Sequence, residues 1–391
     1  MELVFTLYVF IAVNFRIVIS QSISQTKSLH SFLFTDYNKN VKPVLDQSTT
    51  VNFQMDFILL SINEFDTVEG TFSLVGVLNC SWTDESLVWT PSSYGGLSSI
   101  NVPQSDIWVP DLFIINQAEK FTPFGKSVDI KLTVSHSGLV SWYPGDVMKV
   151  KCAPNLKNFP FDEQSCSIQF VVFGSSSTEV MFGISQTTVN TDFFSTNKEW
   201  RLDSSSLKLE STGRVTATLN ISRAWLYFTV TVLIPIYVIG LLIPLVFLLP
   251  VETGERVSFS TSIFLSFTVV LTLVNSEIPS LSDPIPGIMI FIEVLTVLSG
   301  LTVVINVAIL TYYFSTGEEV RFTCLKRFLC IFSTSNKIYD NETSNENAKL
   351  HKNDNIRKKD VVKRLNTVSL IGSYFVIIVL SVAFTTGTRF L

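Results

Sequence analysis

The distribution of hydrophobic positions divides the chain into two parts. From about residue 28 to 224, short runs rich in β-branched residues are broken by Gly, Pro, Asn and Ser, and stretches such as 71–82 and 126–134 alternate apolar with polar positions. A period of two is typical of strands with one buried face. We expect an all-β, immunoglobulin-like sandwich of about ten strands, preceded by a short helix near residues 26–36.

Beyond Arg223 the pattern changes to long apolar stretches. Each is long enough for the hydrocarbon core of a bilayer, which takes about 20 helical residues to cross. The sequence therefore predicts an all-α bundle of four transmembrane helices. We place them at residues 225–249, 256–276, 285–313 and 365–386.

The second apolar stretch carries its polar residues along one helical face. Seven positions recur at steps of three and four and so form one stripe: Glu255, Ser258, Ser262, Leu265, Val269, Thr272 and Ser276. Hydroxyl groups gain nothing from facing lipid, so the stripe is expected to face water or protein. Symmetric copies around an axis would turn each position into a ring, as in a pore lining. An ordinary packed helix with Ser and Thr at its contacts is the alternative.

Lysine and arginine set the expected orientation. The segment 314–364 holds eleven Lys and Arg residues, whereas the turn 276–284 holds none. The short segment 314–364 is therefore expected in the cytoplasm. Residues 1–22 are expected to form a signal peptide, with an uncleaved anchor as the alternative. Residues 23–224 are then an extracellular domain, and residues 387–391 an extracellular carboxyl terminus.

Charge and motif content narrow the functional classes. Residues 21–224 carry 20 acidic against 14 basic side chains, which repels nucleic acid and mildly concentrates cations. The three histidines share no metal-ligand spacing, and no phosphate loop or nucleophile elbow occurs, so no enzyme, cofactor or metal site is expected. Asn79 and Asn220 begin glycosylation sequons. The polar tract 334–355 is expected to be disordered.

Five cysteines are divided by this topology. Cys80, Cys152 and Cys166 lie outside, where disulfides are stable, whereas Cys324 and Cys330 lie inside. Closing the loop between Cys152 and Cys166 would be worth about 3 kcal/mol in the chain-entropy model. Cys80 has no evident partner and is expected to be a buried thiol.

The motifs along the chain resemble those of the Cys-loop, or pentameric ligand-gated ion channel, family, in its nicotinic acetylcholine receptor branch. They are Asn158-Phe159-Pro160-Phe161-Asp162 between the two cysteines, Ser81-Trp82-Thr83-Asp84, Trp108-Val109-Pro110-Asp111, Leu233-Ile234-Pro235 and Gly254-Glu255-Arg256. The resemblance covers residues 28–391 apart from the cytoplasmic tract. It implies a Cys152–Cys166 disulfide, and a homo- or hetero-pentamer of identical or related subunits in the plasma membrane, surrounded by membrane lipids.

The resemblance also implies a choice of ion. Glu255 would form an anionic ring at the cytoplasmic mouth of the pore, with Glu252 as a candidate second ring, so that monovalent cations are favoured. Arg256 is expected behind the ring, away from the lumen. Leu265 and Val269 would form two apolar rings that close the pore by dewetting.

The agonist site departs from the family pattern. Counted from the shared motifs, the aromatic positions that hold a quaternary ammonium in relatives fall on Ile115, Phe173 and Val77. An interface cavity walled by Val77, Ile115, Tyr143, Phe173 and Leu207 would take an apolar or amphipathic small molecule. The alternative is an accessory subunit that binds no agonist and co-assembles with related subunits.

A last set of residues matches the region of the family that couples binding to opening. Arg223 precedes the first span and is expected to need a carboxylate partner, for which Glu64, Asp66 and Asp162 are candidates. The whole set comprises Glu64, Asp66, Phe159, Pro160, Phe161, Asp162, Arg223, Pro279 and Asp283.

Overall fold

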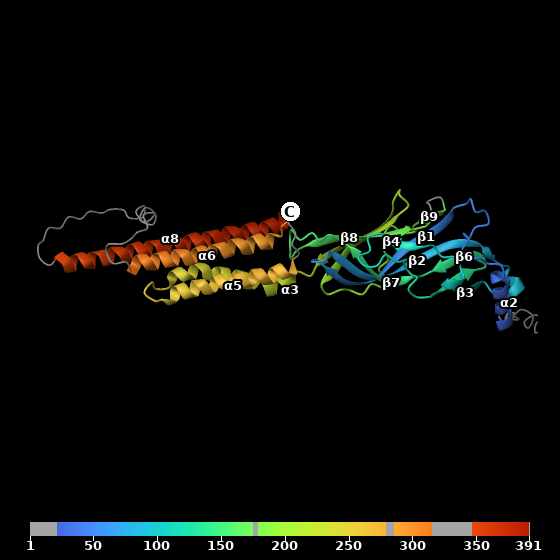
Figure 1. The fold of residues 1–391 in the computed structure, drawn as a ribbon, viewed down its shortest axis with the longest axis horizontal. Helices are drawn as coiled ribbons and strands as arrows, with labels where there is room; N and C mark the ends of the chain where they lie inside the picture. The colour runs from blue at the N-terminus through green and yellow to red at the C-terminus, as the bar shows by residue number, and fades with distance from the viewer. Residues whose placement is uncertain (1–21, 175–178, 279–284, 315–345, 391) are drawn as a thin grey trace, which may run out of the picture. The chain divides into compact units, whose positions relative to one another are not determined.

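The computed structural model describes residues 22–174, 179–278, 285–314 and 346–390, which fall into two compact units. Both are drawn in Figure 1. The β unit comprises the chain up to Asp66, Gly70–Ala153 and Ser165–Ile221, and the helical unit comprises Thr67–Glu69, Pro154–Gln164 and the chain from Ser222.

Several predicted features lie outside the described residues. They are residues 1–21 of the predicted signal peptide, Pro279 and Asp283 of the coupling set, and residues 315–345 of the predicted cytoplasmic segment.

The β unit contains two sheets, as the period-two pattern predicts. The larger sheet has the order β3-β5-β6-β2-β1-β9, with β7 also paired to β2, and the smaller sheet has the order β10-β11-β8-β4. The strands are β1 Val51–Asp66, β2 Thr71–Val88, β3 Ser99–Pro103, β4 Leu112–Ile114, β5 Lys131–Ser135, β6 Ser137–Trp142, β7 Gly145–Lys151, β8 Glu163–Val172, β9 Val180–Gly183, β10 Trp200–Leu209 and β11 Val215–Arg223. The described residues thus hold eleven strands, against about ten predicted.

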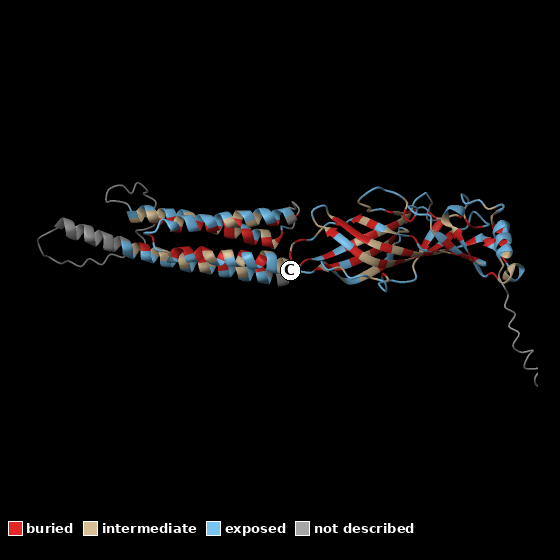
Figure 2. Ribbon diagram, turned by 90° about the horizontal axis from the view of Figure 1, so that it is seen from below, coloured by how far each residue is buried: buried red, intermediate tan, exposed pale blue. Residues whose placement is uncertain are grey.

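Strand β1 shows how the alternation becomes a core. Its odd-numbered residues from Val51 to Leu59 are buried, and the residues between them are partly or fully exposed. The Phe57 ring lies against β2, where a Cβ added at Gly76 would come within 2.3 Å of it. Glycine therefore lets β2 pass close beneath a large core side chain. In Figure 2 this alternation appears as red and pale blue along the strands.

The predicted amino-terminal helix is α2, Ile23–Phe34. It begins with a capping box, in which Ser22 and Gln25 each bond the other's backbone N–H. Leu29 and Leu33, one turn apart, are buried and join the β-unit core. Two single 3₁₀ turns, η1 Pro91–Tyr94 and η2 Gln104–Asp106, flank β3.

Among its described residues, the helical unit holds four segments that are long and apolar enough to cross a membrane, in agreement with the four predicted spans. They are Leu226–Leu248, Glu255–Ser276, Gly287–Phe314 and Lys359–Thr386. The first is built from α3 Leu226–Phe228, the π-helical turn η3 Thr229–Leu233, α4 Ile234–Leu245 and η4 Val246–Leu248, and the others lie in α5 Glu255–Glu277, α6 Gly287–Phe314 and α8 Glu346–Phe390.

The last helix begins earlier than the sequence predicts. α8 starts at Glu346, so residues 346–355 are helical, whereas they were expected to be disordered. Ala, Lys and Leu at 348–350 are strong helix formers, and no Gly or Pro separates this stretch from the apolar span. The polar composition of the tract led to the prediction of disorder, although its residues 346–355 continue into the helix.

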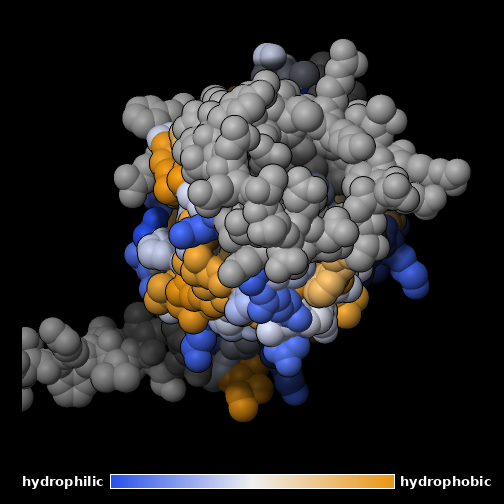
Figure 3. Space-filling model, turned by 90° about the vertical axis from the view of Figure 1, so that its left-hand side faces the viewer, coloured by the Kyte–Doolittle hydropathy of each residue, from blue (hydrophilic) through white to orange (hydrophobic). Residues whose placement is uncertain are grey.

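A hydrophobic core joins the four spans. Ile236 of α4, Phe267 of α5, Ile292 of α6 and Ile377 of α8 are all buried in it. The outward faces of the helices remain exposed and apolar in the single chain (Figure 2). Figure 3 views the chain from the left-hand side of Figure 1, and patches of hydrophobic and of hydrophilic side chains lie next to each other on the coloured part of the surface.

Candidate functional site

Helix α5 exposes the predicted stripe and buries its opposite face. All seven stripe residues, from Glu255 to Ser276, are exposed in the chain. Five residues on the other side are buried in the helical unit: Arg256, Ser260, Ile263, Phe267 and Val274. The large apolar side chains hold α5 against its own bundle, and the stripe points away from it.

The stripe hydroxyls donate to the backbone of their own helix. Ser262 Oγ donates to the Ser258 carbonyl at 3.0 Å, and the Thr272 and Ser276 hydroxyls donate to carbonyls three residues earlier at 2.7 Å. A hydroxyl whose hydrogen is donated to the helix backbone can only accept hydrogen bonds from its surroundings. The exposed oxygen atoms are therefore acceptors.

Arg256 lies on the buried face, as predicted. Its side chain is 2% exposed, Nε donates to Asn306 Oδ1 on α6, and Nη2 donates to Asn366 Oδ1 on α8, both at 2.8 Å. The guanidinium also lies over the Phe247 ring, 5.3 Å from its centroid. Two amide oxygens and one aromatic face therefore hold the charge away from the stripe.

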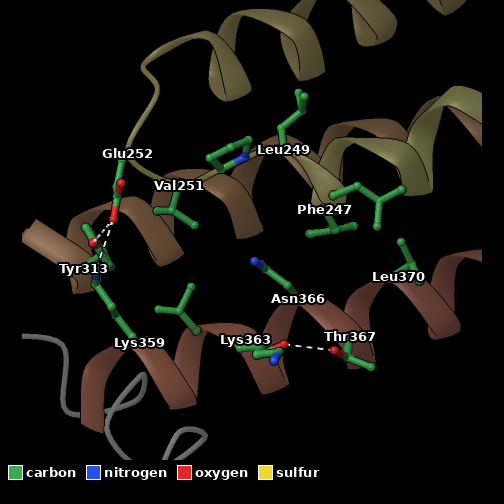
Figure 4. Close-up of a pocket in the computed structure, with 13 residues that line it drawn as sticks. Phe247, Leu249, Val251, Glu252, Tyr313, Lys359, Lys363, Asn366, Thr367 and Leu370 are labelled. Carbon is green, nitrogen blue, oxygen red and sulfur yellow. Dashed lines mark hydrogen bonds and ion pairs between the residues drawn. The ribbon is translucent and has the colours of Figure 1, made fainter. Parts of the chain in front are cut away.

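Glu252, the candidate for a second acidic ring, is bonded within the chain. Its carboxylate accepts a hydrogen bond from the Tyr313 hydroxyl at 2.7 Å and lies 3.3 Å from Lys359 Nζ (Figure 4). The Tyr313 hydrogen bond, followed by Lys359, lowers the pKa of Glu252. Within one chain the carboxylate is thus directed at Tyr313 of α6 and Lys359 of α8, and a second acidic ring at this position stays a prediction.

Arg223 forms a buried ion pair with Asp162, one of its three candidate partners. Nε lies 2.8 Å from Asp162 Oδ1 and Nη2 lies 3.3 Å from Oδ2, and both side chains are almost fully buried. The guanidinium also lies over the rings of Phe159 and Phe228, at 5.1 and 5.2 Å. Gln164 donates to Asp162 Oδ2 at 2.7 Å, so the carboxylate is held from two sides.

The rest of the coupling set is divided between the two units. Phe161 is 39% exposed and contacts Trp225, with ring centroids 5.6 Å apart, and the neighbouring Pro160 is buried. Glu64 and Asp66 lie at the end of β1. The disulfide predicted by the resemblance joins Cys152 and Cys166.

The predicted ligand walls fall at two places in the β unit. Ile115 follows β4 and Phe173 follows β8 in the smaller sheet. Because these strands are antiparallel, the Ile115 N–H bonds the Gln169 carbonyl within β8, and the Phe173 N–H bonds the Asp111 carbonyl just before β4. Val77 lies in β2, and Tyr143 lies in the turn between β6 and β7. Ile115, Phe173 and Tyr143 are exposed and Val77 is partly exposed.

Leu207 does not belong to this surface. It is 1% exposed and lies in the β-unit core, which corrects the expectation that it walls a cavity. The prediction for Leu207 depended on the register of the short β10–β11 hairpin. A register shift of one residue moves a side chain from the exposed face of a strand to the buried face.

Three phenylalanines form an apolar cluster beside Ile115. Phe113 and Phe121 are stacked with centroids 4.7 Å apart, and Phe173 meets both edge-on at 5.3 and 5.4 Å. Phe121 and Phe173 remain exposed in the chain. Exposed apolar rings grouped in this way are typical of a binding surface.

The glycosylation candidates and the third outer cysteine also have defined places. Asn220 is exposed on β11 and its amide donates to Ser204, whereas Asn79 is partly buried in β2. Cys80 is a buried thiol, as expected, and burial raises its pKa.

Family models match both units. The neurotransmitter-gated ion-channel ligand binding domain matches residues 26–231, and the neurotransmitter-gated ion-channel transmembrane region matches residues 232–373. The chain belongs to the neurotransmitter-gated ion-channel family. With its four apolar spans it is a multi-pass membrane protein of the ligand-gated ion-channel type.

Curated relatives of this ion-channel family are nicotinic subunits. Neuronal acetylcholine receptor subunit beta-3 of Rattus norvegicus is 32% identical over 72% of this chain and 62% of its own length. Subunit alpha-6 of Rattus norvegicus is 29% identical over 75% and 61%, and acetylcholine receptor subunit alpha-1-B of Xenopus laevis is 31% identical over 70% and 62%. The chain spans about three fifths of the length of these relatives.

Several residues of this channel-family site were not predicted from the sequence. Asn306 and Asn366 hold Arg256, and Gln164 holds Asp162. A lone amide within an apolar span such as α6 is itself a signal, because a polar group in a bilayer needs a partner. The Phe113–Phe121 stacking has no such signal, because the two residues are separated by an irregular loop.

Proposed function

We propose that the chain is a subunit of a pentameric, cation-selective ligand-gated channel whose pore is lined by the α5 stripe. The observation that carries the proposal is the division of α5 into a fully exposed stripe and a buried opposite face. Five copies arranged around an axis would cover the stripe from lipid and give its polar groups water. The β unit would then lie outside the cell, because the Lys- and Arg-rich segment favours the cytoplasm.

The proposed ion choice rests on charge and on hydroxyl orientation. Glu255 is exposed at the start of the stripe, while the neighbouring Arg256 is buried and held by Asn306 and Asn366. The hydroxyl oxygens of Ser262, Thr272 and Ser276 present lone pairs, since their hydrogens are donated to the helix backbone. Both features favour cations over anions in the lumen.

Leu265 and Val269 are the proposed gate. They are 62% and 52% exposed in the chain and lie one turn apart on the stripe. Five copies of each would give two adjacent apolar rings, and a narrow passage lined only by such rings expels its water and stops ions. Opening would require α5 to move the rings apart.

The proposed agonist is an apolar or amphipathic small molecule. Ile115 and the three-phenylalanine cluster supply an apolar wall, and Val77 with Tyr143 supplies a second wall on the other sheet. A site completed by a neighbouring subunit would bring one wall of each copy together. The surfaces hold apolar side chains where an ammonium-binding site would use several Tyr and Trp rings.

The runner-up function is an accessory subunit that binds no agonist and co-assembles with nicotinic-like subunits. It is favoured by the same absence of the family's Tyr and Trp at Ile115, Phe173 and Val77. It would still line a pore, so the two functions differ in the response to ligand and share the effect of gate mutations.

The test is to record currents from cells that express the chain alone and with a Leu265→Ser substitution. Hydroxyl groups in place of the Leu265 ring should let water remain in the pore, so the variant should leak cations without any ligand. Phe264→Ser is the matched control, because Phe264 precedes Leu265 on α5 and is 37% exposed but is not three or four residues from any stripe position.

Equal leak from the Leu265 and Phe264 variants would refute the assigned pore face. If currents appear only when a nicotinic subunit is co-expressed, and ligand sensitivity follows that subunit, the accessory function replaces the agonist-binding one.

A further inference from the structure

A single carboxylate interrupts the apolar surface of α6. Glu293 is the seventh residue of the span Gly287–Phe314, so it lies about 9 Å along the helix from the start of that span. Its side chain is exposed, and it has no hydrogen-bond or ion-pair partner among the described residues. A charged group inside a membrane span is costly unless a partner compensates it. Glu293 is therefore a candidate binding residue.

The face of α6 that carries Glu293 is otherwise apolar. Its other positions at steps of three and four are each more than half exposed: Ile290, Val297, Leu301 and Val304. Gly300 lies on the same face, and a Cβ added there would come within 3.4 Å of the Phe264 ring of α5. Because glycine has no side chain, the surface dips at Gly300, with the Phe264 ring at the edge of the dip.

The approach of Phe264 to Gly300 shows which part of α5 borders Glu293. The two helices lie side by side (Figure 1), and the short connection 278–286 between them means that they run in opposite directions. Glu293 lies two turns from Gly300, so it is level with the part of α5 that lies two turns from Phe264. Thr268 and Asn275 share the Phe264 face of α5 and lie on either side of that level.

The oxygen atoms of these side chains are acceptors. The Thr268 hydroxyl donates to the Leu265 carbonyl at 2.7 Å, so its oxygen can only accept from a ligand. The Glu293 carboxylate has no hydrogen to donate, and the amide oxygen of the exposed Asn275 is a further acceptor. A matching ligand would carry a positive charge and N–H donors at one end and hydrocarbon at the other.

We propose that Glu293 binds the ammonium group of an amphipathic primary amine, whose hydrocarbon chain lies along Val297, Leu301 and Val304. The carboxylate compensates the charge, and Thr268 and Asn275 accept further N–H bonds. A primary ammonium has three N–H donors, as a lysine side chain has, whereas a quaternary ammonium has none. The site therefore differs in chemistry from a cage of aromatic rings, which holds a quaternary ammonium through its charge alone.

The experiment measures binding of dodecylamine to the purified full chain in neutral detergent by native mass spectrometry. Three further probes each lack one feature of this ligand. 1-Dodecanol lacks the charge, ethylamine lacks the hydrocarbon chain, and dodecyltrimethylammonium lacks the N–H donors. We expect saturable binding of dodecylamine and binding of each other probe that is weaker by about tenfold or more.

Substitutions locate the site. Glu293→Gln should weaken dodecylamine binding about tenfold or more, because a charge-assisted hydrogen bond is lost. Glu255→Gln is the matched control, since Glu255 is also an exposed carboxylate of a span but lies on the α5 stripe, and it should leave the affinity unchanged. The double variant Glu293→Gln/Val297→Glu moves the carboxylate one turn along the same exposed face. It should recover part of the binding, which a misfolded chain would not do.

Four results would overturn the proposal. Equal losses for Glu293→Gln and Glu255→Gln would place the amine on the α5 stripe, and an unchanged affinity of Glu293→Gln would indicate that a second copy of the chain covers the carboxylate. A loss without recovery in the double variant would make Glu293 a structural residue. Binding of dodecyltrimethylammonium as tight as that of dodecylamine would exclude the N–H contacts. No current is recorded in this measurement, so its outcome is independent of the proposed channel function.

Discussion

Two buried arginines of the helical unit are satisfied in different ways. Arg223 has a carboxylate, Asp162, in bidentate contact, whereas Arg256 has only amide oxygens and an aromatic ring among the described residues, and its Nη1 lacks a hydrogen-bond partner there. Removing one member of a buried ion pair leaves an uncompensated charge, which costs about 3–5 kcal/mol. Arg223 should therefore be the more sensitive position for folding.

Arg223→Gln tests this at the level of one residue. We expect a loss of about 3–5 kcal/mol in the free energy of unfolding, since Asp162 stays buried without its partner. Thermal unfolding of the full chain and surface expression report the loss. Adding Asp162→Asn should recover much of it, because both charges are then gone.

Arg201→Gln is the control for this prediction. Arg201 also pairs with an aspartate, Asp203, but its side chain is 78% exposed, so the change should stay below about 1 kcal/mol. Equal losses at Arg201 and Arg223, or no recovery in the double variant, would contradict the role assigned to the buried pair.

At the scale of elements, β2 carries a buried carboxylate that should make stability depend on pH. Asp84 is fully buried and accepts from the Tyr37 hydroxyl at 2.7 Å and from the Ser86 N–H at 3.0 Å. Burial raises the pKa of Asp84, and the two hydrogen bonds oppose part of that rise. The Tyr37 hydroxyl thus links the residues after α2 to the centre of β2.

Asp84→Asn tests the sign of this effect. With a folded pKa above the unfolded one, Asp84 contributes stability that is present below about pH 4, the unfolded value, and is lost as pH rises through the folded pKa. The stability of Asp84→Asn relative to the natural chain should therefore increase with pH in this window. Chemical denaturation of the full chain at a series of pH values measures it.

The amide has one acceptor oxygen in place of two, so a constant loss is superimposed, and the slope is the decisive quantity. Glu210 serves as a control, because the pH dependence of its contribution to stability should have the opposite sign. Hydrogen bonding from Thr216, followed by Arg214, lowers its pKa, so its stabilising contribution is lost as pH falls. A relative stability of Asp84→Asn that is flat or falls with pH would refute the prediction.

The elements themselves could be largely predicted from periodicity. The period of two at residues 71–82, which lie in β2, and the exposed face of α5 each depend on one chain segment, and both agree with the structure. Of the alternating stretch 126–134, only the part from Lys131 is a strand. The sequence alone could not place Leu207 or Glu252, because both positions depend on other parts of the chain. The face of β10 on which Leu207 lies depends on the short hairpin after it. The direction of the Glu252 carboxylate depends on Tyr313 and Lys359, which are far away in the sequence.

At the scale of the whole molecule, the proposed agonist site is divided. Phe173 and Tyr143 belong to different sheets of the β unit, so each subunit would supply a different wall to each of its two neighbours. A site of this kind exists only in the assembly, and mixed assemblies should reveal its two halves.

Subunit complementation is the corresponding prediction. Phe173→Ala and Tyr143→Ala chains expressed separately should each lose ligand-evoked current, whereas co-expression should restore part of it. Some interfaces then pair an intact Phe173 with an intact Tyr143. Phe193→Ala serves as a control, since Phe193 is exposed outside the three-phenylalanine cluster. Failure of the mixture to recover any response would place both residues on the same wall.

The loop from Pro154 to Gln164 belongs to the helical unit, although the cysteines on either side of it belong to the β unit. The disulfide makes this stretch a covalent ring. A protease that cut the ring once would add only one water to the mass and leave both fragments attached to each other, so they would separate only after a reductant opened the disulfide. The polypeptide can in this way be severed at Phe161 without coming apart.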